Sequence, residues 1–117
     1  RMIGFAQMSL HSYLICRADI VIVPSYSDAW GIVVDEGMQL GKVVLASKGV
    51  GSAIDRINHL ENGLIFDIDG ENSLQHYLTM VFRDSDLRMH LKRSSQKSAS
   101  VFNPDRNCEQ LAKVLEI

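Results

Sequence analysis

The chain has 117 residues, of which 46% are hydrophobic and 22% charged, the composition of an ordinary globular domain. Its formal net charge of −2 gives no reason to expect nucleic acid or an anionic membrane as the main partner. No apolar run reaches the roughly 20 residues of a membrane span. The only cysteines, Cys16 and Cys108, lack metal-ligand spacing, so we expect a cytoplasmic protein with two reduced thiols.

The first part of the chain alternates between helical and extended patterns. Residues 9–18 place apolar side chains on one helical face, and Ser9 is a plausible N-cap for that helix. Residues 19–25 form a continuous apolar run, which is typical of a parallel strand buried on both faces. A helix is expected over residues 29–40, because Gly41 can end it in the C′ position.

The middle of the chain continues the alternation. A second buried strand is predicted over residues 42–47, and the loop 48–52 leads from it into a short helix over residues 53–58. An Asn-Gly turn within residues 61–63 then precedes a third strand over residues 64–68. Short strands separated by helices imply βαβ crossovers, so the predicted fold class is α/β, with a doubly wound parallel sheet.

The last part of the chain reads as three helices. Asp69 is a candidate N-cap for a helix whose apolar stripe runs to Val81. Leu87 and Leu91 predict a further helix, which carries cations in its later turns. Pro104 is well placed in the first turn of a last helix. The apolar stripe of that last helix consists of Cys108, Leu111, Ala112 and Leu115.

Two loops in this pattern are candidates for a ligand site. Ligands of open α/β sheets bind beyond the carboxyl ends of the strands, and residues 24–31 and 47–52 both lead from such a strand end into a helix. Free N–H groups and the positive end of the helix dipole favour an anion there, although most such turns bind nothing. Lys48 could reach an anion, but a solvated loop lysine is the more common case. The candidates in the second loop are Gly49, Gly51 and Ser52.

Two carboxylates, Asp28 and Glu36, stand eight positions apart around the start of the predicted helix 29–40. Glu36 shares its helical face with apolar side chains, where a carboxylate is costly unless a group donates hydrogen bonds to it. That group is either a structural partner, such as a backbone N–H or a buried arginine, or a ligand. For Asp28 the pattern alone favours a role as N-cap, which is worth roughly 1 kcal/mol.

The sequence from Ala18 onward resembles a known family. It reads "ADIVIVPSYSDAWGIVVDEGMQLGKVVLASKGVGSAIDRINHLENGLIFDIDGENSLQHYL". It is similar to the C-terminal domain of the retaining GT-B glycosyltransferases of family 4 (glycosyl transferase group 1). The shared pattern is a strand ending in Pro-Ser, an acidic residue, an aromatic residue, a glycine and a second acidic residue. A helix of small residues, an apolar strand, a glycine loop and an Asn-Gly turn follow in the same order. Flanking segments resemble the family too, so nearly the whole chain is covered.

The resemblance implies a fold and a role for each matching residue. The chain would be the later part of a C-terminal nucleotide-sugar-binding domain, with a partial Rossmann-like parallel sheet flanked by helices. Asp28 would be the catalytic carboxylate that contacts the donor sugar, and Glu36 would accept hydrogen bonds from the ribose hydroxyls. Backbone N–H groups around Trp30, Gly31 and Ile32 would face the sugar and the distal phosphate. The Trp30 side chain either packs under the loop or forms part of the sugar pocket.

The chain departs from the family pattern at several positions. Asp28 stands where the family usually has the longer Glu, and Ser52 stands where the second loop glycine usually is. Lys42-Val43 replaces the usual residue-Pro pair. The family's basic pair, an Arg and a Lys that clamp the diphosphate, is expected before Arg1, and the opening of the chain suggests a piece cut from a longer protein.

The function expected from this resemblance is sugar transfer. The chain would be the donor-binding part of a retaining glycosyltransferase of the hexosyltransferase type. That enzyme would move a sugar from a nucleotide diphosphate sugar to a hydroxyl of a glycan, a lipid or a small molecule. The family needs no metal, and the donor is a substrate, so no cofactor is expected. The acceptor would bind through an N-terminal domain outside this chain, and the isolated chain is therefore expected to be inactive.

Two other interpretations stay open. The chain could be a non-catalytic donor-binding or scaffolding subunit that associates with a separate partner chain, and an open sheet edge could then support a dimer. A flavodoxin-like binding domain ranks last, because it predicts no ordered acidic-Gly-acidic motif. A peripheral position at the inner face of a membrane is also left open.

Overall fold

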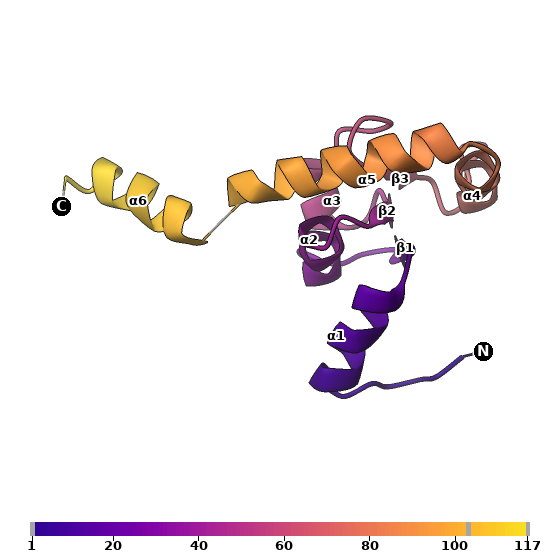
Figure 1. The fold of residues 1–117 in the computed structure, drawn as a ribbon, viewed down its shortest axis with the longest axis horizontal. Helices are drawn as coiled ribbons and strands as arrows, with labels where there is room; N and C mark the ends of the chain where they lie inside the picture. The colour runs from indigo at the N-terminus through magenta and orange to yellow at the C-terminus, as the bar shows by residue number, and fades with distance from the viewer. Residues whose placement is uncertain (1, 103, 117) are drawn as a thin grey trace.

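The computed structural model describes residues 2–102 and 104–116. These residues form an α/β unit built on a three-stranded parallel sheet with strand order β1-β2-β3 (Figure 1). The elements in chain order are α1 (Met8–Arg17), β1 (Ile20–Val23), α2 (Ile32–Gln39), β2 (Val43–Ser47), α3 (Gly51–Arg56), β3 (Leu64–Phe66), α4 (Leu74–Arg83), α5 (Ser85–Ala99), the 3-10 turn η1 (Ser100–Phe102) and α6 (Pro104–Val114).

The sheet is covered by helices on both faces. In β2, Val44 and Ala46 pack into a cluster with residues of α2 and α3, whereas Val43 and Leu45 pack into a second cluster with residues of α4 and α5. Because side chains alternate along a strand, these two clusters lie on opposite faces of the sheet. All five residues of β2 are buried, as its continuous apolar run predicts. The predicted doubly wound, Rossmann-like fold class is confirmed.

Strand β1 differs from the prediction that it is buried on both faces. Ile22 is 38% exposed, although Val21 and Val23 are buried. Among the described strands β1 pairs only with β2, and on the second face α4 and α5 contact β3 and β2. The helices therefore leave Ile22 uncovered at the edge of the sheet.

The predicted cap of α1 is wrong, and the predicted end of α2 is confirmed. Helix α1 begins at Met8, with Gln7 in the N-cap position and no side-chain cap, so Ser9 is not its cap. Helix α2 ends as predicted, because Gly41 has a φ of +65° and donates its N–H to the carbonyl of Met38. The N–H of Lys42 also bonds to the carbonyl of Gly37, which completes a Schellman motif.

The helix that follows β3 also has a different N-cap from the predicted one. The N-cap of α4 is Ser73, whose hydroxyl accepts the N–H of His76, and not Asp69, which lies outside the helix. The predicted apolar stripes place Val81 and Leu91 in the core of the second cluster. Helix α6 lies apart from the body of the molecule (Figure 1), and its stripe residue Leu111 is 58% exposed. No helix in the described ranges is long and apolar enough to cross a membrane.

Candidate functional site

The loops that follow the three strands meet at the carboxyl edge of the sheet. The first loop (residues 24–31) pairs with the second loop through a parallel bridge between Asp28 and Val50. Next to this bridge, Lys48 forms an ion pair of 2.8 Å with Asp67, at the end of β3. The three loops border an open pocket of about 330 Å³. It is lined by Tyr26, Ser47, Lys48, Gly49, Asp67, Ile68, Asp69 and Gly70.

Asp28 lies in a turn before α2 and does not cap the helix. Its carboxylate accepts the N–H of Trp30 at 3.1 Å, which closes a turn two residues long. Its own N–H donates to the carbonyl of Gly49, and its carbonyl accepts the N–H of Gly51. Three bonds thus hold Asp28 at the junction of the two loops, and α2 begins only at Ile32.

Gly31 makes the sharp entry into α2. It has a φ of +78°, a conformation that glycine adopts without steric cost. A Cβ at this position would stand 2.5 Å from Cγ1 of Val50, so glycine is also needed for space. Gly31 is the N-cap residue, and no side chain caps the helix. The first N–H groups of α2 therefore carry the positive end of the helix dipole without a side-chain partner.

The second loop supports the first. A Cβ on Gly49 would lie 2.0 Å from the carbonyl oxygen of Tyr26, and one on Gly51 would lie 2.2 Å from that of Ala29. The N–H of Gly51 donates to Asp28 and that of Ser52 donates to the carbonyl of Trp30. These two N–H groups are engaged with the first loop and are not available to an anion. The glycines serve the close approach of two backbones.

Ser52 has a role that a glycine could not fill. Its side chain is fully buried, and its hydroxyl donates to the carbonyl of Gly31 at 3.0 Å. The departure from the usual glycine thus adds one hydrogen bond to the turn that starts α2. Lys48, the other candidate in this loop, is engaged with a carboxylate.

Glu36 is a half-buried carboxylate on α2, and a histidine of α1 contacts it. Nε2 of His11 lies 2.9 Å from the Oε2 atom of Glu36, and the two side chains are 34% and 35% exposed. The neighbours Ile32 and Leu40 are exposed, so the helical face that carries Glu36 borders solvent. His11 is 25 residues away in sequence, and no local pattern pairs the two residues.

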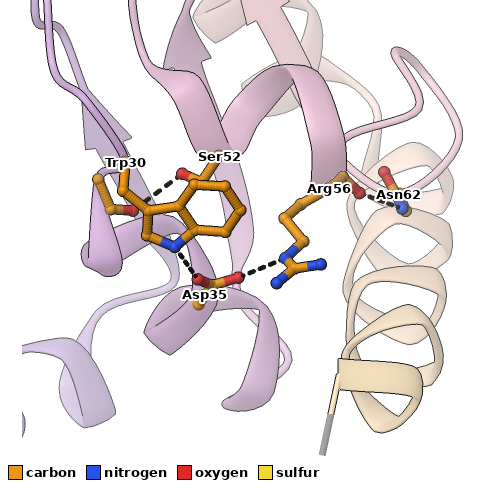
Figure 2. A network of polar contacts seen from close by, with 6 residues as sticks. Trp30, Asp35, Ser52, Arg56 and Asn62 are labelled. Carbon is orange, nitrogen blue, oxygen red and sulfur yellow. Dashed lines mark hydrogen bonds and ion pairs between the residues drawn. The ribbon is translucent and has the colours of Figure 1, made fainter. Parts of the chain in front are cut away.

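Trp30 is held by side chains from α2 and α3, as Figure 2 shows. Its indole N–H donates to Asp35 at 2.8 Å, and Nε of Arg56 donates to the other oxygen of the same carboxylate at 2.9 Å. The guanidinium carbon of Arg56 lies 5.1 Å from the centre of the Trp30 ring. The sequence pattern had given neither Asp35 nor Arg56 a role.

Solved structures define the class of this fold. The chain aligns with Alr3699/HepE from Anabaena in complex with UDP at a TM-score of 0.78 and 26% identity, over 88% of this chain and 29% of that one. It aligns with the C-terminal domain of a glycosyl transferase group 1 family protein (LpcC) from Francisella tularensis at a TM-score of 0.74 and 25% identity, over 85% of this chain and 51% of that one. The fold is that of a GT-B glycosyltransferase C-terminal domain.

Sequence comparison names the family. The model for glycosyl transferases group 1 matches residues 1–98, and the chain belongs to this family. A D-inositol 3-phosphate glycosyltransferase from Corynebacterium jeikeium (strain K411) is 30% identical over 99 residues, which are 85% of this chain and 23% of the relative. A second one, from Salinispora arenicola (strain CNS-205), is 29% identical over 97 residues, which are 83% of this chain and 21% of the relative. The chain thus spans less than a quarter of the length of these relatives. The predicted resemblance is confirmed.

Proposed function

We propose that the chain is the donor-binding part of a retaining glycosyltransferase, which transfers a sugar from a nucleotide diphosphate sugar to a hydroxyl group. The observation that carries the proposal is the start of α2 directly after Gly31, without a side-chain cap and with Asp28 and Glu36 on either side. Membership of the glycosyltransferase family supports it. So do structural neighbours in complex with UDP and with UDP-glucose.

In this proposal the first turn of α2 binds the charged end of the donor. Its N–H groups and the helix dipole stabilise the distal phosphate, and the charge that grows on the departing diphosphate in the transition state. Asp28 contacts the sugar. It is one methylene shorter than Glu, so its reach depends on the turn that the Trp30 N–H closes.

Glu36 binds the ribose hydroxyls. An ionised carboxylate has about four acceptor positions, so the contact with His11 leaves acceptor capacity for a ribose hydroxyl. His11 would then stand beside the nucleoside and complete this end of the site.

The rest of the enzyme lies outside the described site. We propose that an N-terminal domain binds the glycan, lipid or small-molecule acceptor, that the sugar is a hexose, and that the chain alone transfers no sugar. Metal independence belongs to the same proposal. Among the described residues, no group of three or more His, Cys, Asp or Glu side chains could hold a metal ion. A cytoplasmic location, or a peripheral one at a membrane, stays a prediction.

The experiment that tests the donor site is a titration followed by amide chemical shifts. UDP, GDP, ADP and their hexose conjugates are added to the chain, to Glu36→Ala and to the control Glu109→Ala on α6. We expect one nucleotide to shift the amides at the start of α2 saturably. We expect Glu36→Ala to weaken it about tenfold to a hundredfold, the loss for a hydrogen bond to a charged group. A folded chain that binds none of these nucleotides would contradict the proposal.

A second candidate function is a non-catalytic donor-binding or scaffolding subunit. The exposed Ile22 on the outer strand β1 favours it, because an uncovered apolar strand edge can pair with another chain.

A further inference from the structure

The short helix α3 contacts the first loop from both of its ends. At its N-terminal end, Ser52 donates its N–H to the carbonyl of Trp30 and its hydroxyl to the carbonyl of Gly31. At its C-terminal end, Arg56 bonds to Asp35, which also accepts the Trp30 indole N–H. Backbone and side chain of Trp30 are therefore both fixed against one helix (Figure 2).

Asp35 joins two donors that come from different elements. One carboxylate oxygen binds the indole of the first loop, and the other binds the guanidinium of α3. The side chains of Arg56 and Asp35 are only 20% and 21% exposed, so water and salt screen this ion pair weakly. The pair between Lys92 and Asp19, by contrast, is 37% and 84% exposed.

Phe102, the last residue of η1, also contacts the Arg56 guanidinium. Its ring centre lies 3.6 Å from the guanidinium carbon of Arg56, within the range of a cation–π interaction. The guanidinium thus lies near two aromatic rings, one from the first loop and one from η1, while its Nε bonds to a carboxylate. A planar, delocalised cation can make all these contacts at once, and an ammonium group cannot.

We propose that Asp35 and Arg56 are positioning residues for the donor. They fix the Trp30 indole and so hold the Trp30–Gly31 peptide, which orients the first N–H groups of α2 toward the distal phosphate. This inference rests on the proposed function. It assigns the orientation of the phosphate-binding N–H groups to Asp35 and Arg56, which do not themselves touch the donor. Pre-organising the loop removes the cost of ordering it when the donor binds.

The chemistry of the network predicts an order of effects among variants. Asp35→Leu and Arg56→Met remove the ion pair and should have the largest effects. Asp35→Asn keeps an oxygen that can accept the indole N–H but loses the charge, so it should be intermediate. Arg56→Lys keeps the charge without the planar group, and we expect it to recover less than half of the loss.

The first experiment needs no ligand. Trp30 is the only tryptophan of the chain, so intrinsic fluorescence and the indole N–H resonance report on this ring alone. In Arg56→Met and Asp35→Leu we expect the indole resonance to move. We also expect the amides of Trp30 and Ser52, which donate to Asp28 and to the Trp30 carbonyl, to exchange about fivefold faster or more. The control Lys92→Met removes the exposed ion pair and should change neither. Unchanged indole and amide signals in folded variants would overturn the proposal.

The second experiment compares UDP with UMP, which lacks the distal phosphate. Because the network orients the phosphate end, Arg56→Met should lower the UDP-to-UMP affinity ratio about fivefold or more. Glu36→Ala acts at the ribose and should weaken both nucleotides equally. A merely destabilised variant also weakens both, so an unchanged ratio in Arg56→Met, or its full recovery in Arg56→Lys, would overturn the proposal. If UDP does not bind, the same ratio is measured with GDP and GMP or with ADP and AMP. If the native chain binds none of the three diphosphates, the proposed function fails, and amide exchange alone decides the positioning role.

Discussion

Glu36 illustrates what a single residue contributes to this site. The sequence indicated a carboxylate on an apolar helix face that needs a hydrogen-bond donor, with a backbone N–H, an arginine or a ligand as candidates. The structure supplies a fourth partner, His11, which stands on a different helix. Since both side chains are about one third exposed, a ribose could approach the same carboxylate. The need for a partner was readable from the sequence, but its identity was not.

The environment of His59 sets the direction in which its pKa is shifted. Its Nδ1 accepts the N–H of Ile65, and its ring packs edge-on against Tyr77. Burial lowers the pKa of His59 below the ordinary 6.5. The unfolded chain then binds more protons than the folded one between that lowered pKa and 6.5, so the free energy of unfolding should fall as the pH decreases through this window.

The measurement is the melting temperature between pH 7.5 and 5. We expect a modest decline in the native chain and a flatter profile in His59→Asn, which removes the imidazole. The control His90→Gln removes an exposed histidine on α5 and should keep the native slope. A melting temperature that rises toward pH 5 would show that the charged form of His59 is the one that the fold favours.

At the scale of the element, the start of α2 depends on the second loop. The apolar pattern predicted a helix from residue 29, but the turn at Asp28 and the left-handed Gly31 delay it to Ile32. The carbonyls of Trp30 and Gly31 accept bonds from Ser52. These bonds come from 21 or 22 positions further along the chain, and a pattern confined to the helix does not contain them.

This dependence predicts that Gly51→Ala is destabilising. A Cβ at Gly51 would meet the carbonyl oxygen of Ala29 at 2.2 Å, and backbone cannot move aside as a flexible side chain can. We expect a loss of about 2 kcal/mol or more in the free energy of unfolding, toward the upper end of overpacking effects. Denaturation in urea measures it.

Gly37→Ala provides the matched control. Its Cβ would meet a methyl group of the buried Val44 at 2.9 Å, a longer contact than the 2.2 Å to backbone at Gly51, and alanine in a helix interior gains roughly 0.5–1 kcal/mol over glycine. The control should therefore cost less than Gly51→Ala. Equal stability of Gly51→Ala and the native chain would show that the two loops separate without cost.

At the scale of the whole molecule, the outer strand β1 of the described sheet carries an exposed apolar side chain. Ile22 on β1 is exposed next to the free edge of the described sheet. For the isolated chain we expect self-association that increases with concentration, because an open apolar edge can pair with a second copy. Ile22→Lys should shift the chain to monomer, since a charge on an edge strand opposes pairing.

Light scattering coupled to gel filtration distinguishes these states. The control Ile54→Lys introduces the same charge on α3, where Ile54 is 69% exposed, and should leave the association unchanged. A native chain that is monomeric at every concentration would argue against the pairing of two copies through β1.

The sequence by itself determined the order of helices and strands, the buried strand β2 and the Gly41 helix end, because each depends on residues adjacent in the chain. It also carried the family resemblance and singled out Asp28, Gly31 and Glu36. Only the tertiary structure decided the exposure of Ile22 and the contacts of Asp35, because these depend on elements that meet after folding. Side-chain contacts between residues far apart in the sequence leave no periodic signal, whereas helices and strands have their own periods in the sequence.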